Sequence, residues 1–535
     1  MQLDGGSILG AETTQSGAVT FRAHDPASGR ALDPVFHEAT DAEAAKAVEL
    51  AADAFPAYRK KSPDAIAHFL ETIADGLERL GPELIARASS ETALPEARLI
   101  SERGRTMGQL RMFAALVREG SWVDAHIDRA DPARTPLPKP DLRKMLVPLG
   151  PVVVFGASNF PLAYSVCGGD TASALAAGNP VVVKGHPAHP GTSELTARVV
   201  QQAARTCDMP AGVFSMLQGA RPELSIALVR HPSAKAVGFT GSLQGGRALF
   251  DAAASRPSPI PVFAEMGSLN PIFVLPGALK AHAAEIAESI SKSVTTGVGQ
   301  FCTKPGQIAG LRSPEFDAFI KRLGALVSCT PPGTMLHAGI AERYRAGFSE
   351  RSGSRGVHLA AEAPPAPHGA TETQVPSAVF VTGAQSFLDD SKLREELFGP
   401  ATLATVCDSR EDLESVARKL AGQLTVTIHA NEDDVREYAS LFDILREKAG
   451  RLIFGGVPTG VEVVPAMQHG GPYPATTDSR FTSVGTAAIL RFVRPVCYQN
   501  FPHEWLPAEL KNENPRGILR LVDGEWSRAP LANPS

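Results

Sequence analysis

Short runs of β-branched residues that alternate with helical stretches restrict the fold of this chain more than any other feature. The runs VVVF and VVVK cover residues 152–155 and 181–184 and are bounded by Gly and Pro, and further strand-like runs follow in AKAVGFTGS and PIPVFAEMG. Strands that are apolar at every position are buried on both faces, and helices connect such strands when they run parallel. The sequence therefore predicts an α/β fold with a doubly wound parallel sheet.

Helical periodicity surrounds these strands. Between residues 41 and 117 apolar residues recur at three- and four-residue intervals, which predicts helices, and Thr40 or Asp41 is placed to cap the first of them. From about residue 268 to about 465 the alternation begins again, with a helix expected over 282–296 between two short apolar runs. The chain thus contains two α/β units, and its 535 residues suit two to four domains.

Charge and cysteine content exclude several classes of partner. The formal net charge of -5 gives no reason to expect nucleic acid or an anionic membrane, which both favour a concentrated positive surface. No apolar run reaches the roughly 18 residues of a membrane span, and the start MQLDGGSILG lacks the features of a secretory signal. Six cysteines without a paired CxxC spacing argue against a disulfide framework and a zinc site. We therefore expect a cytoplasmic protein that holds no metal.

One cysteine lies in a segment suited to nucleophilic chemistry. Cys302 is in GQFCTKPGQ, residues 299–307, where Gly and Pro on both sides predict a bend that exposes the thiol near backbone donors. A lone cysteine in a turn is more often a small buried apolar residue, so the other residues of the fold must decide its role.

Polar residues and glycines follow the predicted strands of the first unit. Asn159 and Lys184 lie at or just after strand ends, where ligands bind in an open α/β sheet. Gly241 and Gly246 flank a strand-to-helix turn, and Ser242 between them is expected at a helix N-terminus suited to a pyrophosphate. Each of these residues is also common in ordinary turns and strand edges, so only their combination is informative.

A carboxylate completes the set. Glu265 ends the run FAEMG, where apolar surroundings would raise its pKa and suit it to act as a general base. Together these segments resemble the aldehyde dehydrogenase family. The motifs SNFPLA, AAGNPVVVK, FTGS followed by a glycine, AEMGSLNP, GQFCTKPG and EELFGP occur in that order and extend over nearly the whole chain.

The resemblance implies a mechanism. Cys302 would attack the aldehyde carbon to form a thiohemiacetal, with Asn159 and the Cys302 backbone N–H holding the oxyanion. Hydride transfer to a nicotinamide would leave a thioacyl-enzyme, and Glu265 would activate the water that hydrolyses it. Since relatives that pass the acyl group to coenzyme A typically lack this base, a free carboxylic acid is the expected product.

The resemblance also implies the cofactor site. Lys184 and Ser242 would bind the ribose and phosphate portions, while Glu396 and Phe398 in EELFGP would hold the nicotinamide ribose and ring.

One departure from the family pattern concerns the choice of cofactor. NAD-preferring relatives usually carry Glu three residues after the strand lysine, where this chain has Pro187. The absence of that carboxylate removes its repulsion of a 2′-phosphate, and His186 with Lys184 could add positive charge. We therefore expect NADP to be accepted and preferred over NAD.

Three stretches, residues 102–114, 183–194 and 469–502, are similar to bacterial 2,5-dioxovalerate dehydrogenases, also called alpha-ketoglutaric semialdehyde dehydrogenases. The expected reaction is oxidation of 2,5-dioxopentanoate, a small aldehyde, to 2-oxoglutarate. An NADP-dependent long-chain fatty aldehyde dehydrogenase shares much of this pattern and is the alternative. A catalytically silent structural or binding relative is a more distant one.

The two substrate classes need different pockets. A 2-oxo acid aldehyde carries a carboxylate, so its site needs a cation or several N–H donors. The candidates are Arg103, Arg111 and Arg480, although most arginines on helices are solvated or paired for structural reasons. A fatty aldehyde would need a long apolar tunnel.

The resemblance finally implies the architecture. A Rossmann-like cofactor domain, an α/β catalytic domain, a small β oligomerisation element and a C-terminal tail are expected. Their residues would be 1–124 with 149–267, 268–468, 125–148 with 482–502, and 503–535, respectively. A strand is expected over residues 484–500 of this element, and its exposed edge would pair with a partner subunit, so a homodimer or homotetramer is expected.

Overall fold

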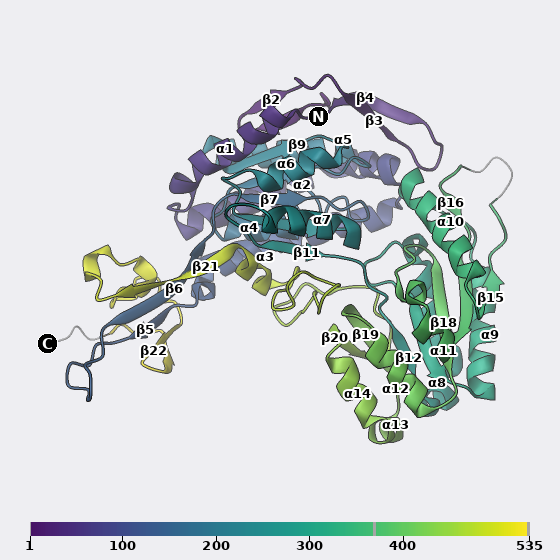
Figure 1. Ribbon diagram of the computed structural model, residues 1–535. Helices are drawn as coiled ribbons and strands as arrows, with labels where there is room; N and C mark the ends of the chain where they lie inside the picture. The colour runs from purple at the N-terminus through teal and green to yellow at the C-terminus, as the bar shows by residue number, and fades with distance from the viewer. Residues whose placement is uncertain (1, 367–370, 532–535) are drawn as a thin grey trace.

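The computed structural model describes residues 2–366 and 371–531 (Figure 1). Two seven-stranded sheets, each covered by helices, form the body of the molecule, and a five-stranded sheet projects from it (Figure 1). Both α/β units expected from the strand and helix alternation are therefore present. Among the described helices, none is both long enough and apolar enough to cross a membrane.

The first sheet has the order β11-β10-β7-β8-β9-β1-β2, and its strands run parallel from β11 to β9. All residues of the VVVF and VVVK strands are buried, so both faces of the sheet need helices. The strands are β1 Ser7–Leu9, β2 Glu12–Thr14, β7 Val152–Phe155, β8 Val181–Lys184, β9 Phe214–Leu217, β10 Ala236–Thr240 and β11 Val262–Glu265. The helices are α1 Asp41–Tyr58, α2 Pro63–Thr92, α3 Glu96–Glu119, α4 Gly169–Ala176, α5 Pro190–Thr206, α6 Pro222–Arg230 and α7 Leu243–Ala254.

Local signals define where α1 begins. Thr40 is the N-cap, its side chain accepts from the backbone N–H of Glu43, and the Glu43 carboxylate accepts from the backbone N–H of Thr40. This reciprocal capping box satisfies two donors that a helix end leaves free. It selects Thr40 rather than Asp41 as the cap.

The second sheet has the order β15-β17-β18-β13-β12-β19-β20, with only the edge strand β15 antiparallel to its neighbour. Its strands are β12 Ile272–Val274, β13 Gln307–Leu311, β15 Val357–Glu362, β17 Ala378–Gly383, β18 Ala401–Cys407, β19 Gln423–His429 and β20 Ala449–Phe454. The helices around it are α8 Pro276–Thr295, α9 Pro314–Ser328, α10 Ala338–Gly353, α11 Ala384–Asp389, α12 Arg410–Lys419, α13 Glu432–Glu437 and α14 Ala439–Arg446. Two small two-stranded sheets pair β3 Thr20–His24 with β4 Ala31–His37, and β14 Gly333–Thr334 with β16 Gln374–Val375.

Helix α8 has a segment that the sequence did not predict. The predicted helix over 282–296 corresponds to the part of α8 that follows a kink at His282, whose φ of -136° is not helical, and a further helical segment begins at Pro276. The Asp434 carboxylate accepts hydrogen bonds from the backbone N–H groups of Gly277 and Ala278, at 2.8 and 2.9 Å. A residue distant in the sequence therefore caps this helix, and the local pattern could not show it.

The third sheet has the order β21-β6-β5-β22-β23 and forms the projection in Figure 1. Its strands are β5 His126–Asp128, β6 Leu142–Pro148, β21 Val493–Gln499, β22 Arg520–Val522 and β23 Glu525–Ser527. The residues that the sequence left as a tail after 503 thus contribute two strands. The strand expected through 484–500 is correct only in its second half, since Thr486–Phe492 forms a 3-10 helix that packs Ile489 and Phe492 into the first core.

The segment between β20 and the 3-10 helix at Thr486–Phe492, residues 455–485, is a loop that contacts both large sheets. Met266, directly after β11, donates its backbone N–H to the carbonyl of Ala475, and Gly422 before β19 donates to the carbonyl of Tyr473. Glu265 also forms an isolated bridge with Thr476. Residues from both sheets and from this loop can therefore meet at one place.

Candidate active site

Cys302 lies in a tight bend between α8 and β13, and its side chain is half-buried. Gly297 and Gly299 before it have φ of 58° and 63°, and a Cβ at Gly299 would lie 2.3 Å from the carbonyl oxygen of Gly399. This bend therefore requires glycine. The side-chain amide of Asn270 donates to the backbone carbonyl of Cys302 at 2.8 Å and so fixes the position of this bend.

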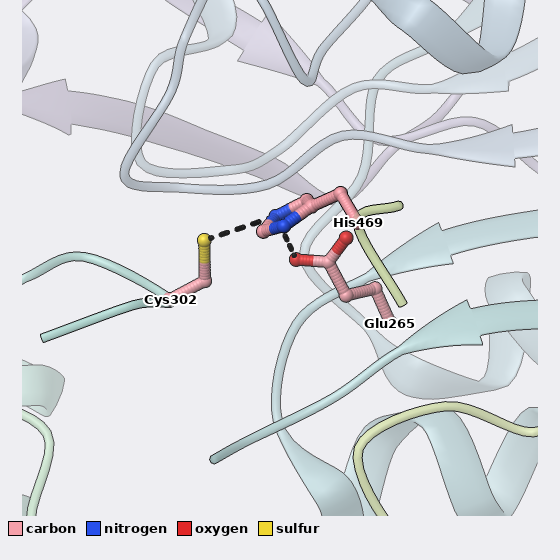
Figure 2. Close-up of side chains that lie close together, drawn as sticks. All are labelled: Glu265, Cys302 and His469. Atoms are coloured by element: carbon pink, nitrogen blue, oxygen red, sulfur yellow. Dashed lines mark hydrogen bonds and ion pairs between the residues drawn. The ribbon is translucent and has the colours of Figure 1, made fainter. Parts of the chain in front are cut away.

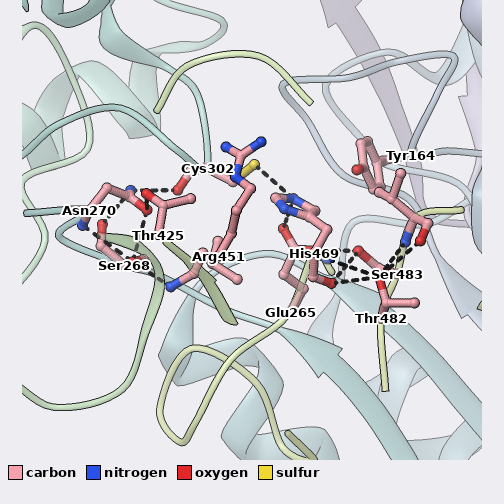
Figure 3. Close-up of polar contacts among 12 residues, drawn as sticks. Tyr164, Glu265, Ser268, Asn270, Cys302, Thr425, Arg451, His469, Thr482 and Ser483 are labelled. Carbon is pink, nitrogen blue, oxygen red and sulfur yellow. Dashed lines mark hydrogen bonds and ion pairs between the residues drawn. The ribbon is translucent and has the colours of Figure 1, made fainter. Parts of the chain in front are cut away.

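A histidine and a carboxylate face the thiol (Figure 2). The Sγ of Cys302 lies 3.5 Å from Nε2 of His469, and the same nitrogen lies 3.1 Å from Oε1 of Glu265. Ser483 donates its hydroxyl to the other carboxylate oxygen, Oε2, at 2.5 Å. His469 and Glu265 are buried, at 0 and 3% side-chain exposure. The four groups form a chain from hydroxyl to carboxylate to imidazole to thiol (Figure 3).

The burial and the charges of these groups shift the pKa values of Cys302 and Glu265 in opposite directions. Burial, with the negative charge of Glu265, raises the pKa of the Cys302 thiol well above its usual value, and the positive charge of Arg105 opposes this rise. Burial also acts to raise the pKa of Glu265, but His469 and Ser483 outweigh it and lower that pKa below its ordinary value. The expectation of a raised pKa at Glu265 is therefore wrong, because buried partners stabilise the carboxylate.

His469 was not selected from the sequence. It lies in HGGPYP, inside the stretch 469–502 that carried the similarity to one subgroup, and a histidine among glycines was the only available signal. Its place beside Cys302 depends on the loop that joins the two sheets.

Cys302, His469 and Glu265 also have the composition of a metal site. Their candidate ligand atoms lie within 4.8 Å of one another, and thiolate, imidazole and carboxylate are ligands of Zn²⁺. The absence of a CxxC pair, on which the expectation of no metal rested, does not address a cluster assembled from three distant segments.

Asn159, just after β7, lies against the nucleophile loop. Its side-chain amide donates to the backbone carbonyl of Gln300 at 3.0 Å. The backbone carbonyl of Asn159 accepts from the guanidinium of Arg98 at 2.7 Å. The amide has a second N–H, so it can donate to a substrate oxygen without losing this contact. The structure thus brings Asn159 to the loop that carries Cys302.

The residues chosen for the cofactor lie at the ends of β8 and β10. Lys184 ends β8 with 8% exposure, and burial lowers its pKa to about 8. Within the described residues its ammonium has no hydrogen-bond partner. Ser242 caps α7 by accepting the backbone N–H of Gly245 at 3.2 Å, and Gly241 beside it is exposed. A Cβ at Gly246 would lie 2.7 Å from the side chain of Met266, so the helix packs too closely on β11 for a larger residue.

These features fit a dinucleotide. An exposed helix N-terminus attracts a pyrophosphate, and a buried cation without a partner suits ribose hydroxyls or a phosphate. His186, however, does not add positive charge. Burial, with the nearby His189 and Lys184, holds the pKa of His186 well below its usual value, and its Nδ1 accepts the N–H of Ala188 at 3.1 Å. This part of the expectation is wrong, although Nε2–H of a neutral ring is still a donor.

Glu396 and Phe398, both half-buried, lie in the loop before β18. Burial raises the pKa of Glu396 to about 7 and lowers that of the neighbouring Lys304 to about 8. The ammonium of Lys304 donates to the carbonyls of Leu397 and Ala401, at 3.0 and 2.9 Å. The loop that carries Glu396 is therefore tied to the loop that carries Cys302.

The arginines suggested for a substrate carboxylate lie elsewhere. Arg111 is paired with Asp75 and Glu78 on the outer surface of α2 and α3, and Arg480 is 79% exposed and paired with Asp478.

The described contacts likewise do not bring Arg103 to the nucleophile. The arginines whose charge interacts with Cys302 are Arg105 and Arg451 (Figure 3 shows Arg451).

Comparisons with known proteins agree with this geometry. Residues 13–443 match the model of the aldehyde dehydrogenase family. Alpha-ketoglutaric semialdehyde dehydrogenase 2 of Azospirillum brasilense is 51% identical over 98% of this chain and 100% of that protein. The alpha-ketoglutaric semialdehyde dehydrogenase of Acinetobacter baylyi is 44% identical over 97% of this chain and 98% of that protein. The structure of lactaldehyde dehydrogenase from Escherichia coli superposes with a TM-score of 0.79 at 20% identity, over 92% of this chain and 98% of that one.

Proposed function

This chain belongs to the aldehyde dehydrogenase family, and we propose that it oxidises alpha-ketoglutaric semialdehyde (2,5-dioxopentanoate) to 2-oxoglutarate with NADP as the preferred cofactor. The observation that carries the substrate is the 51% identity with a protein of that name over the full length of the relative. The contacts among the side chains of Cys302, His469 and Glu265 support the proposed oxidation of an aldehyde.

The first step needs a proton acceptor beside the thiol. Burial and the charge of Glu265 raise the pKa of the Cys302 thiol, which favours the protonated form, a weak nucleophile. We propose that His469 reacts as the neutral tautomer that carries its ring proton on Nδ1, so that Nε2, 3.5 Å away, takes the thiol proton as the sulfur attacks the aldehyde carbon. The Nε2–H that forms then donates to the ionised carboxylate of Glu265 at 3.1 Å, which stabilises the charged imidazole.

The amide of Asn159 and the backbone N–H of Cys302 then hold the oxyanion of the thiohemiacetal. A nicotinamide held by Glu396 and Phe398 would supply the acceptor for the hydride that leaves this carbon. The product is a thioester on Cys302. Glu265, kept ionised by His469 and Ser483, accepts a proton from the water that hydrolyses it.

On the cofactor side, Lys184 and the first turn of α7 would bind the ribose and phosphates, and Glu396 the nicotinamide ribose. Pro187 puts no carboxylate where a 2′-phosphate would lie. Lys184, a buried cation without a hydrogen-bond partner among the described residues, would be free to hold that phosphate, which supports the preference for NADP.

The third sheet supports assembly into a homodimer or homotetramer. Strand β21 is an edge strand whose residues are exposed or half-buried, so its free backbone groups can pair with a second subunit. Light scattering of the purified protein measures the state directly, and a monomer at all concentrations would exclude this use of β21.

The substrate is tested by initial rates of NADP reduction with 2,5-dioxopentanoate and with a long-chain alkanal. We expect kcat/KM to favour the dioxo acid by about 100-fold, which corresponds to about 2.7 kcal/mol. The opposite preference would mean that the enzyme is a fatty aldehyde dehydrogenase, and the proposed mechanism would still apply.

A further inference from the structure

Three aromatic side chains form a wall next to the nucleophile. Phe160 follows Asn159, Phe301 precedes Cys302, and Tyr164 lies in the turn before α4. The ring of Phe160 packs edge-on against both others, with centroids 5.3 Å from Tyr164 and 5.6 Å from Phe301. We call these three residues the aromatic wall.

Two arginines of helix α3 contact this wall. The guanidinium carbon of Arg98 lies 5.2 Å from the Phe160 centroid and 4.6 Å from that of Phe301. That of Arg105 lies 5.3 Å from Tyr164 and 6.0 Å from Phe160. Spacings of three and four residues place Arg98, Glu102 and Arg105 on one face of α3.

The positive charge of this face is not balanced. No ion pair among the described residues includes Arg98 or Arg105. Glu102, the acid between them, already accepts the backbone N–H groups of Leu162 and Ala163, at 2.9 and 3.0 Å. Burial raises the pKa of Glu102, which further weakens it as a counter-ion. Two half-buried guanidinium groups therefore share one carboxylate that has a single oxygen, Oε2, without a hydrogen bond among the described residues, an arrangement that favours binding of a further anion.

Arg98 and Arg105 both have donors to spare, but they face different groups. Arg98 donates to the backbone carbonyl of Asn159, and Arg451 donates to the carbonyls of Gly460 and Pro458, at 3.0 and 2.7 Å. Among the described residues, the one hydrogen bond of Arg105 goes to the hydroxyl of Tyr164, at 3.1 Å. The charge of Arg105 also acts on Cys302, so the two groups are within electrostatic reach.

We propose that Arg105 and the Tyr164 hydroxyl form a carboxylate subsite. The acid end of a 2-oxo acid semialdehyde binds there, beside the aromatic wall, and its aldehyde end reaches Cys302. This inference rests on the proposed function and deepens it. A guanidinium can donate two parallel hydrogen bonds to a carboxylate, and the hydroxyl of Tyr164 can add a third. The subsite selects aldehydes that carry an acid and gives no advantage to alkanals.

The test compares two aldehydes of equal carbon number, 2,5-dioxopentanoate and pentanal. In Arg105→Gln we expect kcat/KM to fall about 100-fold for the dioxo acid, or about 2.7 kcal/mol, and to change less than about threefold for pentanal. Arg105→Lys should recover part of the loss because it keeps the charge without the planar fork. Equal losses for both aldehydes would show that Arg105 only supports the structure.

Two further variants control for effects on folding. Arg111→Gln removes a guanidinium from the same helix, on the face that pairs with Asp75 and Glu78, and should leave both rates unchanged. Tyr164→Phe keeps the ring of the aromatic wall and removes the hydroxyl. It should lower kcat/KM about tenfold for the dioxo acid and leave that for pentanal unchanged. A uniform effect of Tyr164→Phe on both aldehydes would contradict the role of the hydroxyl.

Inhibition by 2-oxoglutarate separates this inference from the proposed function, because it carries the acid end without an aldehyde. We expect its inhibition constant to rise at least tenfold in Arg105→Gln. If the wild type prefers alkanals but 2-oxoglutarate still inhibits through Arg105, the proposed substrate is wrong and the subsite stands. If the inhibition constant is equal in the wild type and Arg105→Gln, the subsite is wrong whatever the substrate.

Discussion

Lys184 and Ser242, on the proposed cofactor side, follow two strands of a single sheet, β8 and β10, and each lies where its own strand ends. On the nucleophile side, Cys302, Glu265 and His469 come from the bend before β13, from the end of β11 and from the loop between the sheets. The first group is positioned by local strand-to-helix turns, whereas the second exists only when both sheets have docked. Changes on the two sides should therefore have different consequences.

The largest expected effect is on the nucleophile side. His469→Asn removes the proposed proton acceptor, so kcat should fall at least about 100-fold, the range of general-base catalysis. Binding of NADPH, followed by its fluorescence, should stay within about twofold because the described contacts of His469 include neither Lys184 nor Ser242. A variant with normal kcat would mean that His469 is not the acceptor and would remove the main distinction between the two sides.

Glu265→Gln gives a second test of the nucleophile side, at the level of pKa. Burial keeps the pKa of Cys302 high and the charge of Glu265 raises it further, so loss of that charge should lower the pKa. More thiolate is then present at pH 7, and iodoacetamide should label Cys302 about tenfold faster in the absence of cofactor, while steady-state oxidation falls. Mass spectrometry of the Cys302 peptide separates it from the exposed Cys329 and Cys497. Slower labelling would contradict the assigned electrostatics.

A substitution on the cofactor side should change cofactor choice and little else. Pro187→Glu restores the carboxylate that NAD-preferring relatives carry. We expect kcat/KM for NADP to fall about tenfold, or about 1.4 kcal/mol, with a smaller change for NAD. Rates with both cofactors at fixed aldehyde measure this. The matched variant Pro187→Gln, which lacks the charge, should show less than half of that free-energy change.

The smallest expected effect is on the stability of the domain that carries the proposed cofactor site, with no change in catalysis. Thr40→Ala removes half of the capping box of α1 and should lower the free energy of unfolding by about 1 kcal/mol. Thr40→Ser should keep most of the stability, and kcat should be unchanged in both. Denaturant unfolding with activity assays checks this. Loss of activity in Thr40→Ala at a temperature where the protein is folded would link the cap to the site.

Much of the fold could be predicted because its signals are local. Continuous β-branched runs such as 152–155 and 181–184 are buried strands in the structure, and the helices between them follow from periodicity and from a cap such as Thr40. Predictions were incomplete or wrong where a distant partner decides the local structure. Asp434 caps a helical segment before the kink of α8 that was not predicted, and the first core converts residues 486–492 from an expected strand to a 3-10 helix.

Some residues of the candidate site could likewise be predicted from local motifs, and others could not. Cys302, Asn159 and Glu265 were chosen from motifs, and the structure brings all three to one place. Arg105, whose charge acts on Cys302, was missed, since Arg103, Arg105 and Arg111 look alike in sequence on one helix. Only the packing of α3 against the aromatic wall distinguishes them.

The sequence by itself determined the family, the nucleophile and the strand ends that suit a dinucleotide, because these depend on residue type and on spacing along the chain. The tertiary structure decided the proton acceptor and the candidate carboxylate subsite. His469 lies 167 positions from Cys302, and Arg105 donates to Tyr164 from 59 positions away. Contacts at such separations form only when buried elements dock, and the partners that docking brings together then set the charges, as the lowering of the pKa of Glu265 by His469 and Ser483 shows.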